Sequence, residues 1–391
     1  MINKNKLKEK VLFIKEAAGS HSPSITTLLD QIPELKVDID ACFLSNPYAT
    51  DLFMSYLNKI LNTPKFRHIL EYYPPQNFEI RKKISKVIDI NPENIFVGNG
   101  AIEVIQACLH QFESKKLALP IPTFSSYYEF IKDDSQVFKF NLDPDDDYNL
   151  NISEFSRYIK EVKADSCVII NPNNPVGNYL SKKEIKLFLD LNTHLNFIIL
   201  DESFLHFAFE NSELDLIDNS SLVSKYPNLI IIKSMSKDFG IAGIRAGYGV
   251  MNQKRVNSLL SNGYLWNVSG LTNYFFELYS DEIFQVEYQK VRKKYIEDTD
   301  IFFKNLNTIS EIKVYPSKAN FALIKLPENI TSFDFFMEIL IDSNIYLRDC
   351  SDKIGLKGNY VRVASRTKEE NNNIFMSFTC IKKSFFPEND P

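Results

Sequence analysis

The stretch at residues 228–250, NLIIIKSMSKDFGIAGIRAGYGV, decides the fold of this chain. It opens with residues 229–232, a short β-branched apolar run that predicts a strand buried on both faces. The run ends at Ser234-Met235-Ser236-Lys237, and Arg245 follows in a glycine-containing segment. A lysine placed in this way can form a Schiff base with a phosphorylated aldehyde, while the arginine and the serines hold its phosphate. A surface lysine beside a structural arginine fits this stretch equally well, so the rest of the chain has to decide.

The composition excludes several classes of function. The 391 residues are 44% hydrophobic and 24% charged, as in ordinary globular proteins. A net charge of -5 without a basic block argues against a nucleic-acid-binding protein. No apolar run approaches the roughly 20 residues of a membrane span and no signal peptide is recognisable, so we expect a cytosolic protein. The five cysteines form no CxxC pair and the five histidines no ligand spacing, so neither disulfides nor a metal site is predicted.

Short apolar runs alternate with amphipathic helical patterns over the middle of the chain. This alternation predicts an α/β fold in which a mostly parallel sheet carries helices on both faces. Ser181 and Glu184 form a capping box that starts one of the helices. The predicted strands are residues 95–97, 116–119, 135–142, 167–170, 197–200 and 229–232.

A change of pattern near residue 270 predicts a second, smaller α+β domain. A long helical stretch at about residues 272–308 leads to strands at 311–325 and 359–364, and Thr367 and Glu370 form a capping box for a last helix. The N-terminal residues show no regular pattern, and we expect them to pack on the smaller domain. The predicted segments are therefore an irregular N-terminal segment (1–45), a large domain (46–270) and a small C-terminal domain (271–391).

Polar residues follow several of the predicted strands, at the edge where parallel sheets bind ligands. They are Gly98-Asn99-Gly100, Asn174, Asp201 and Lys237. A helix that begins after the glycines would offer free N–H groups to a phosphate, and a buried Asp201 would need a partner such as a pyridinium nitrogen. Asn174 can donate to a phenolic oxygen, and Phe124 can stack on a ring. Each could instead be a helix cap, a turn residue or a core residue, but the ordered set favours a shared site.

The order of these motifs resembles that of the aspartate-aminotransferase-like enzymes, which use pyridoxal 5'-phosphate (PLP). The resemblance covers the chain from about Asn46 to Thr367 and implies the PLP-dependent transferase fold, fold type I. Its motifs are GNG (98–100), PTF (122–124), NPNNPVG (171–177), LDESF (200–204), SMSK (234–237) and GIRAGY (243–248).

Within that superfamily the chain is most similar to threonine-phosphate decarboxylases, with histidinol-phosphate aminotransferases next. Phe204 and the two arginines, Arg348 and Arg362, carry this finer resemblance together with three further segments. The segments are LWNV (265–268), YPSKANF (315–321) and the pair YLRDC (346–350) and NYVRVASR (359–366).

The resemblance implies a role for each matching cofactor residue. Lys237 would form the Schiff base, Asp201 would contact the pyridine nitrogen, and Asn174 would contact the phenolic oxygen. Phe124 would stack on the ring, with Tyr127 as a second candidate. The residues expected at the cofactor phosphate are Ser234, Ser236, Arg245 and the backbone amides of Gly100, Ala101 and Ile102.

The resemblance also implies a substrate site and a partner. Arg362 would bind the substrate carboxylate and Arg348 the substrate phosphate, since the arginine fork suits both groups. Asn174 is expected to border the substrate as well. Tyr73 resembles a tyrosine that reaches the cofactor phosphate from the neighbouring subunit, which implies a homodimer with shared active sites.

Three features depart from the family pattern. Ala101 and Ile102 stand where relatives often have polar residues, so that helix end would rely on backbone donors. Phe204 replaces a tyrosine of most aminotransferases, which leaves Asn174 as the main contact of the phenolic oxygen. A glycine-rich histidine segment is replaced by Ala17-Ala18-Gly19-Ser20-His21. For His21 an exposed position is favoured over a contact with the substrate phosphate.

Three functions follow from the resemblance. We expect a decarboxylase of a small O-phospho-L-amino acid, threonine phosphate or serine phosphate, because two arginines match two anions and no slot for an imidazole is evident. An aminotransferase acting on a phosphorylated substrate is the alternative, because one sequence does not show which bond of the substrate stands perpendicular to the cofactor plane. A silent binding protein of the same fold is a third reading, against which the presence of both Lys237 and Asp201 argues.

Overall fold

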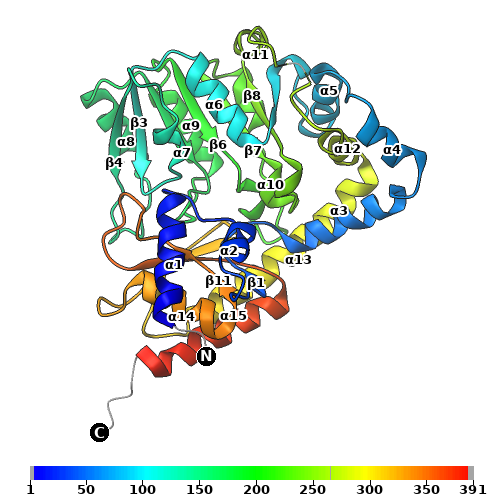
Figure 1. The fold of residues 1–391 in the computed structure, drawn as a ribbon. Coiled ribbons are helices and arrows are strands. Elements are labelled where there is room, and N and C mark those ends of the chain that lie inside the picture. Colours follow the sequence, from blue (N-terminus) through cyan, green and yellow to red (C-terminus); the bar gives the residue numbers. More distant parts are fainter. Residues whose placement is uncertain (1–3, 265, 386–391) are drawn as a thin grey trace. The chain divides into compact units, whose positions relative to one another are not determined.

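The computed structural model describes residues 4–264 and 266–385, which form two compact units (Figure 1). The large unit comprises Ser45–Asn174 and Asn178–Tyr295. The small unit comprises Met1–Leu44, Pro175–Gly177 and Ile296–Pro391, as far as these are described. Leu265 of the LWNV motif lies outside the described residues. No helix of the described chain is long and apolar enough to cross a membrane.

The large unit is built on a seven-stranded sheet, which confirms the predicted α/β fold with a mostly parallel sheet. Strands β7, β6, β5, β3 and β4 are parallel to one another, whereas β8 is antiparallel to both β7 and β2. In spatial order the strands are β2 (Ile95–Asn99), β8 (Ala246–Met251), β7 (Leu229–Ser234), β6 (Phe197–Asp201), β5 (Ser166–Ile170), β3 (Lys116–Ile121) and β4 (Gln136–Asn141).

Strand β8 is the one strand of this sheet that the sequence does not predict. Its sequence AGYGVM contains Gly247 and Gly249, and glycine weakens the apolar pattern of a strand. The structure explains Gly247: a Cβ there would lie 2.4 Å from the backbone nitrogen of Ala101. The first turn of helix α6 (Ala101–Gln111) therefore approaches the sheet so closely that only glycine fits.

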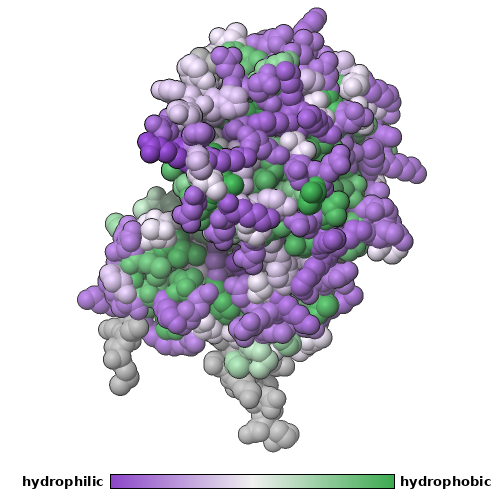
Figure 2. Space-filling model, turned by 90° about the vertical axis from the view of Figure 1, so that its right-hand side faces the viewer, coloured by the Kyte–Doolittle hydropathy of each residue, from purple (hydrophilic) through white to green (hydrophobic). Residues whose placement is uncertain are grey.

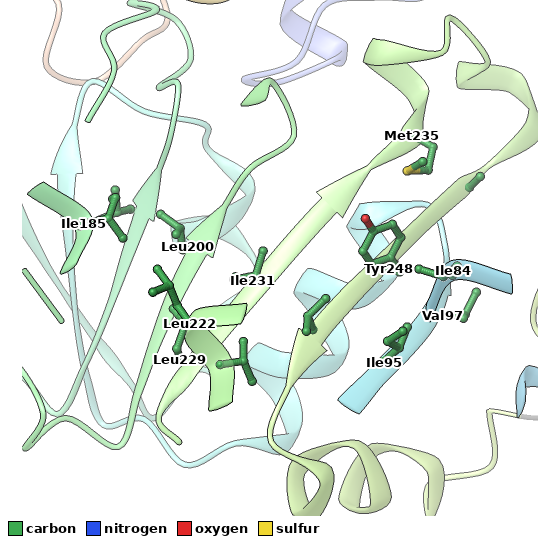
Figure 3. Close-up of a cluster of buried hydrophobic side chains, with 14 of the residues drawn as sticks. Ile84, Ile95, Val97, Ile185, Leu200, Leu222, Leu229, Ile231, Met235 and Tyr248 are labelled. Atoms are coloured by element: carbon green, nitrogen blue, oxygen red, sulfur yellow. The ribbon is translucent and has the colours of Figure 1, made fainter. Parts of the chain in front are cut away.

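Both faces of the sheet are buried, as the apolar runs predict. Along β7, Leu229 and Ile231 belong to the core on one face, and Ile230 and Ile232 to the core on the other. Figure 3 shows Leu200 and Ile231 together on the first of these faces. The helices that pack on this first face include α3 (Pro47–Ile60), α5 (Asn77–Ile88), α8 (Ile152–Glu161), α9 (Lys182–Leu191) and α12 (Gly270–Tyr279). Helices α6 and α11 (Gln253–Leu260) pack on the opposite face.

Helix boundaries in the large unit follow local signals. The predicted capping box of Ser181 and Glu184 starts α9. The predicted single helix at residues 272–308 is wrong, because it is divided into α12 and α13 (Glu282–Leu306). Asp281 accepts from the backbone N–H of Phe284 at 2.9 Å and so opens the second helix. The remaining helices of this unit are α4 (Pro64–Glu71) and the short α7 (Ser126–Glu129) and α10 (Met235–Asp238).

The small unit contains an antiparallel sheet, a two-stranded pairing and four further helices. The sheet order is β12 (Arg348–Asp349), β13 (Tyr360–Ala364), β10 (Phe321–Lys325) and β9 (Lys313–Val314), and β1 (Ile39–Asp40) pairs with β11 (Ile345–Tyr346). Its helices are α1 (Lys4–Ala17), α2 (Ile25–Gln31), α14 (Ser332–Ser343) and α15 (Lys368–Phe385), of which the last is opened by the predicted Thr367/Glu370 capping box.

The prediction that residues 1–45 are irregular is wrong, because they contain α1 and α2. In α1 the buried side chains Leu7, Val11 and Ile14 follow helical spacing. Leu12 and Phe13 obscure this pattern, since both are apolar although they are 41% and 71% exposed. Lys4 and Lys8 of α1 also pair with acidic residues of α14.

Candidate active site

The parallel strands bring the predicted polar residues to one edge of the large unit's sheet. Asp201 is the last residue of β6, and Lys237 lies on α10, directly after β7. Asn174 and Phe124 follow β5 and β3, and the register places Ser234 beside Gly247 of β8. Because β2 also runs in the direction of β7, its Gly98-Asn99-Gly100 turn reaches the same edge. Chemically diverse groups from five strand ends therefore meet in one region.

Asp201 is a buried carboxylate that is held from two sides. The hydroxyl of Tyr127 donates to its Oδ2 at 2.7 Å, and Ser203 donates to its Oδ1 through the backbone N–H at 2.9 Å and through Oγ at 2.5 Å. Burial raises the pKa of Asp201, and these hydrogen bonds act in the opposite direction. A cationic partner at this carboxylate would offset the cost of burying it.

Sequence reasoning did not assign Tyr127 and Ser203 to Asp201. Ser203 could have been found, because a hydrogen bond from residue i+2 to an aspartate is a common local pattern. Tyr127 offered no such signal, since 74 residues separate it from Asp201. Its side chain is fully buried.

The N-terminus of α6 and Arg245 together form an anion-binding corner. Gly100 precedes α6 with φ +81° and provides no side-chain cap, so the first amides of the helix keep their donors for a ligand. A Cβ on Gly100 would lie 2.5 Å from Nη2 of Arg245, and Nη1 of that arginine donates to the carbonyl oxygen of Ala242 at 3.0 Å. The guanidinium is thus fixed against the glycine. The hydroxyls of Ser234 and Ser236 lie at the same sheet edge.

The turn that carries Lys237 is fastened to the start of α3. The backbone N–H of Asn46 donates to the carbonyl oxygen of Lys237 at 3.0 Å, and its side chain donates to that of Asp238 at 3.3 Å. Thr50 donates to the carbonyl oxygen of Gly240 at 2.8 Å. Within the turn, Ser234 Oγ accepts from the backbone N–H of Ser236 at 3.3 Å. These bonds fix the backbone from which the Lys237 side chain extends.

The two predicted substrate arginines lie side by side in the small unit. Arg348 of β12 and Arg362 of β13 are register partners on antiparallel strands, and both side chains are buried. Nη2 of Arg348 donates to Asp352 at 2.6 Å and to the carbonyl oxygen of Ser20 at 2.9 Å. Nη2 of Arg362 donates to the carbonyl oxygen of Cys42 at 2.8 Å, and burial lowers the pKa of Arg362.

Lys353 adds a third cation to this arginine pair, and no pattern in the sequence predicts it. Its side chain is almost fully buried, and its Nζ donates to the same Ser20 carbonyl oxygen at 2.8 Å. Burial lowers the pKa of Lys353, as does the neighbouring Arg348. The three cations share this buried place with the carboxylate of Asp352, which pairs with Arg348 and Lys353, and the remaining positive charge is suited to an anion.

The other predicted residues differ in their exposure. Tyr73 is 81% exposed, and its ring lies 5.2 Å from that of Trp266. His21 is exposed in the small unit, whereas Phe124 and Asn174 are partly buried in the large unit. Phe204, which follows Asp201 by three residues in the sequence, is buried.

Comparison with known proteins identifies the family. The model of the aminotransferase class I and II family matches residues 43–377. The chain belongs to this family. It is 50% identical to the L-serine phosphate decarboxylase of Campylobacter jejuni over 376 residues, or 96% of each chain. It is 43% identical to the L-serine phosphate decarboxylase of Sulfurospirillum multivorans over 95% of each chain. A solved structure of a decarboxylase from Sulfurospirillum multivorans superposes with a TM-score of 0.93 at 42% identity, covering 97% of this chain and 96% of that one.

Enzymes of this family use PLP, and the large unit fits that cofactor. A Cβ at Gly100 would fill the space beside Arg245 and the α6 amides, which are donors suited to a phosphate. Asp201 offers a buried carboxylate to a protonated ring nitrogen, and Lys237 supplies the amine at the same sheet edge. When bound, PLP acts as an electron sink for the pair left behind when a bond at the substrate α-carbon breaks.

Proposed function

We propose that this protein is a PLP-dependent decarboxylase that converts O-phospho-L-serine to O-phosphoethanolamine and carbon dioxide. The observation that carries the proposal is the side-by-side register of Arg348 and Arg362, because the substrate has a carboxylate and a phosphate only a few bonds apart. Side chains opposite each other on antiparallel strands have Cβ atoms about 4.5–5.5 Å apart. Two relatives of similar length, at 50% and 43% identity, are L-serine phosphate decarboxylases, which favours serine phosphate over threonine phosphate.

In the proposed enzyme, residues of the large unit hold the cofactor. Lys237 would carry it, and Asp201 would keep the proton on its ring nitrogen, with Tyr127 and Ser203 orienting the carboxylate. Asn174 would contact its phenolic oxygen, and Phe124 would stack on its ring. Its phosphate would be bound by the amides of Ala101 and Ile102, the hydroxyls of Ser234 and Ser236, and the Arg245 guanidinium. The predicted amide of Gly100 already donates to the carbonyl oxygen of Gly98 at 2.8 Å.

The arginines select the substrate and the bond that breaks. Arg362 holds the carboxylate and Arg348, with Lys353 beside it, holds the phosphate, so that the substrate is fixed at both ends. The bond between the α-carbon and the carboxylate breaks and releases carbon dioxide. A proton is then added to the α-carbon, for which the Lys237 amine is the candidate donor, while the phosphate ester stays intact. His21 is a candidate to reach the phosphate from the N-terminal segment.

We further propose a homodimer in which Tyr73 reaches the cofactor phosphate of the neighbouring subunit. Leu70, Tyr72 and Tyr73 are 65%, 60% and 81% exposed, which is unusual for three large apolar or aromatic side chains in so short a stretch. Figure 2 looks onto the side of the large unit that carries α4 and α5, where hydrophobic side chains gather between hydrophilic ones. A second copy of the chain would cover this surface.

Subunit mixing tests the shared site. Lys237→Ala and Tyr73→Ala proteins should each be poorly active, but a mixed dimer would place both defects in one site and leave the other intact. Activity that rises on mixing supports the proposal, whereas no gain, with exchange of subunits demonstrated, contradicts it.

A product assay tests the reaction itself. The protein loaded with PLP is incubated separately with O-phospho-L-serine and O-phospho-L-threonine, and carbon dioxide and the phosphorylated amine are measured. We expect release from O-phospho-L-serine. Formation of a keto acid with conversion of the cofactor to its amine form, without carbon dioxide, would instead establish an aminotransferase.

A further inference from the structure

Two buried residues of opposite charge lie on either side of the turn that carries Lys237. Lys233, near the end of β7, is 4% exposed, and Asp238, the last residue of α10, is fully buried. Nζ of Lys233 lies 2.6 Å from Oδ2 of Asp238. Charged residues are seldom buried to this extent, so the pair calls for a reason.

The same lysine reaches the neighbouring strand. Its Nζ also donates to the backbone carbonyl oxygen of Glu202 at 3.1 Å. Glu202 follows Asp201 directly, and Asp238 follows Lys237 directly. The Lys233 ammonium therefore links the residue after Asp201 to the residue after Lys237. We assign Asp201 to the ring nitrogen of the cofactor and Lys237 to the amine that carries it.

The surrounding side chains restrict how this link can move. Nδ1 of His206 lies 3.2 Å from Oδ2 of Asp238 and 2.9 Å from the hydroxyl of Tyr288. Arg292 is fully buried and donates to the backbone carbonyl oxygens of His206 and Ala208, which fixes the segment that carries the histidine. Burial keeps the pKa of His206 well below its usual value. With a neutral histidine, Lys233 is the cation in direct contact with Asp238, and the charge of Arg292 adds to its effect.

The contacts between the Lys237 turn and α3 do not provide this link. Asn46 and Thr50 bind the backbone of residues 237–240, but they come from α3 and leave the end of β6 untouched. The backbone pairing of β6 and β7 ends where Asp201 lies opposite Ile232. The last bond between the two backbones runs from the N–H of Glu202 to the carbonyl oxygen of Ile232. Beyond that point, the Lys233 ammonium connects the end of β6 to α10.

We propose that Lys233 and Asp238 are positioning residues that fix Lys237 relative to Asp201. The inference rests on the proposed roles of those two residues at the cofactor. It assigns to the buried pair a task beyond stability: the pair sets the orientation of the bound cofactor and thereby the rate of the chemical step. A misplacement of about 1 Å in an active site can cost on the order of a hundredfold in rate.

Removing both charges at once separates positioning from stability. Lys233→Met alone leaves a buried carboxylate without its cation and should lower the melting temperature strongly, whereas Lys233→Met/Asp238→Leu removes both charges at similar volume and should largely restore it. In the double variant, loaded with PLP, we expect kcat for O-phospho-L-serine to remain at least roughly tenfold below wild type, with KM little changed. The visible circular dichroism of the bound cofactor should also differ from wild type, because it reports the orientation of the ring.

Two controls accompany the double variant. Lys225→Met breaks an exposed lysine–aspartate pair of the large unit and should leave kcat and the spectrum unchanged. Wild-type kcat and wild-type circular dichroism in the folded double variant would overturn the proposal. If the double variant does not fold, Asp238→Asn is measured in the same way, and an unchanged kcat and spectrum at full cofactor occupancy would overturn it as well.

A separate measurement distinguishes failure of this inference from failure of the proposed function. After borohydride reduction and denaturation, the wild-type chain should keep the cofactor and Lys237→Ala should lose it. If Lys237→Ala keeps it, the assignment of Lys237 is wrong. If it loses the cofactor while the double variant behaves like wild type, only the positioning role is wrong.

Discussion

Replacing Tyr127 with phenylalanine should weaken the enzyme through Asp201, without touching the cofactor directly. The hydroxyl of Tyr127 lies 2.7 Å from Oδ2 of Asp201, a normal length for an O–H···O hydrogen bond. A hydrogen bond to a charged group contributes about 1.5–3 kcal/mol, which corresponds to about 10- to 150-fold in an equilibrium or rate constant. The two bonds from Ser203 to Oδ1 remain in the variant, so we expect a loss of this order and no complete inactivation.

The pH dependence gives the sign of the effect. The bond from Tyr127 lowers the pKa of Asp201, so its removal raises that pKa and the carboxylate becomes protonated at a higher pH. The ionised form is the one that pairs with a protonated ring nitrogen. In Tyr127→Phe, the fall of kcat/KM on the acid side should therefore begin at a higher pH than in wild type.

The assay is kcat/KM for O-phospho-L-serine across the acid range, together with the dissociation constant of PLP. Tyr158→Phe serves as the matched control, because that hydroxyl donates to the backbone carbonyl oxygen of Lys139, at the edge strand β4. A folded Tyr127→Phe protein whose acid limb is unchanged, or shifted to lower pH, would refute the reasoning.

Three further predictions concern single residues. Gly100→Ala places a Cβ 2.5 Å from Arg245 at a φ of +81°, so PLP affinity should fall at least about tenfold in equilibrium dialysis; unchanged affinity would contradict the assigned phosphate site. Arg348→Lys loses the fork that suits a phosphate, so KM should rise about 10- to 100-fold with kcat little changed, and an unaltered KM in steady-state kinetics would contradict its role. Burial raises the pKa of Glu202 to about 8, so the folded state binds this proton more tightly than the unfolded state and stability should fall as the pH rises from about 5 to 8. Glu202→Gln should flatten this dependence in denaturant titrations by an amount on the order of a few kcal/mol, and an equally steep dependence in the variant would contradict it.

Much of the large unit could be predicted because its information is local. Buried parallel strands are short β-branched runs, and the residues that follow them must gather at one edge of the sheet. This local information predicts the position of Lys237 and Asp201 at that edge, where the structure has them. Strand β8 escaped prediction for a physical reason: Gly247 is required by the approach of α6, and this requirement erases the apolar pattern.

Features that depend on pairing could not be predicted. The contact between Tyr127 and Asp201 joins residues that are distant in sequence, and the register that sets Arg348 beside Arg362 depends on how β12 and β13 align. Helix α1 could have been recognised from Leu7, Val11 and Ile14, but the exposed apolar pair after Val11 hid their spacing.

The most direct test of the account is the fate of the carboxylate of O-phospho-L-serine. The substrate, labelled with carbon-13 at the carboxyl carbon, is incubated with the PLP-loaded protein, and the products are followed by nuclear magnetic resonance. We predict that the label leaves as carbon dioxide in equal amount to the O-phosphoethanolamine formed, and that Lys237→Ala abolishes both. Retention of the label in a phosphorylated keto acid, or turnover that survives in Lys237→Ala, would contradict the central claim.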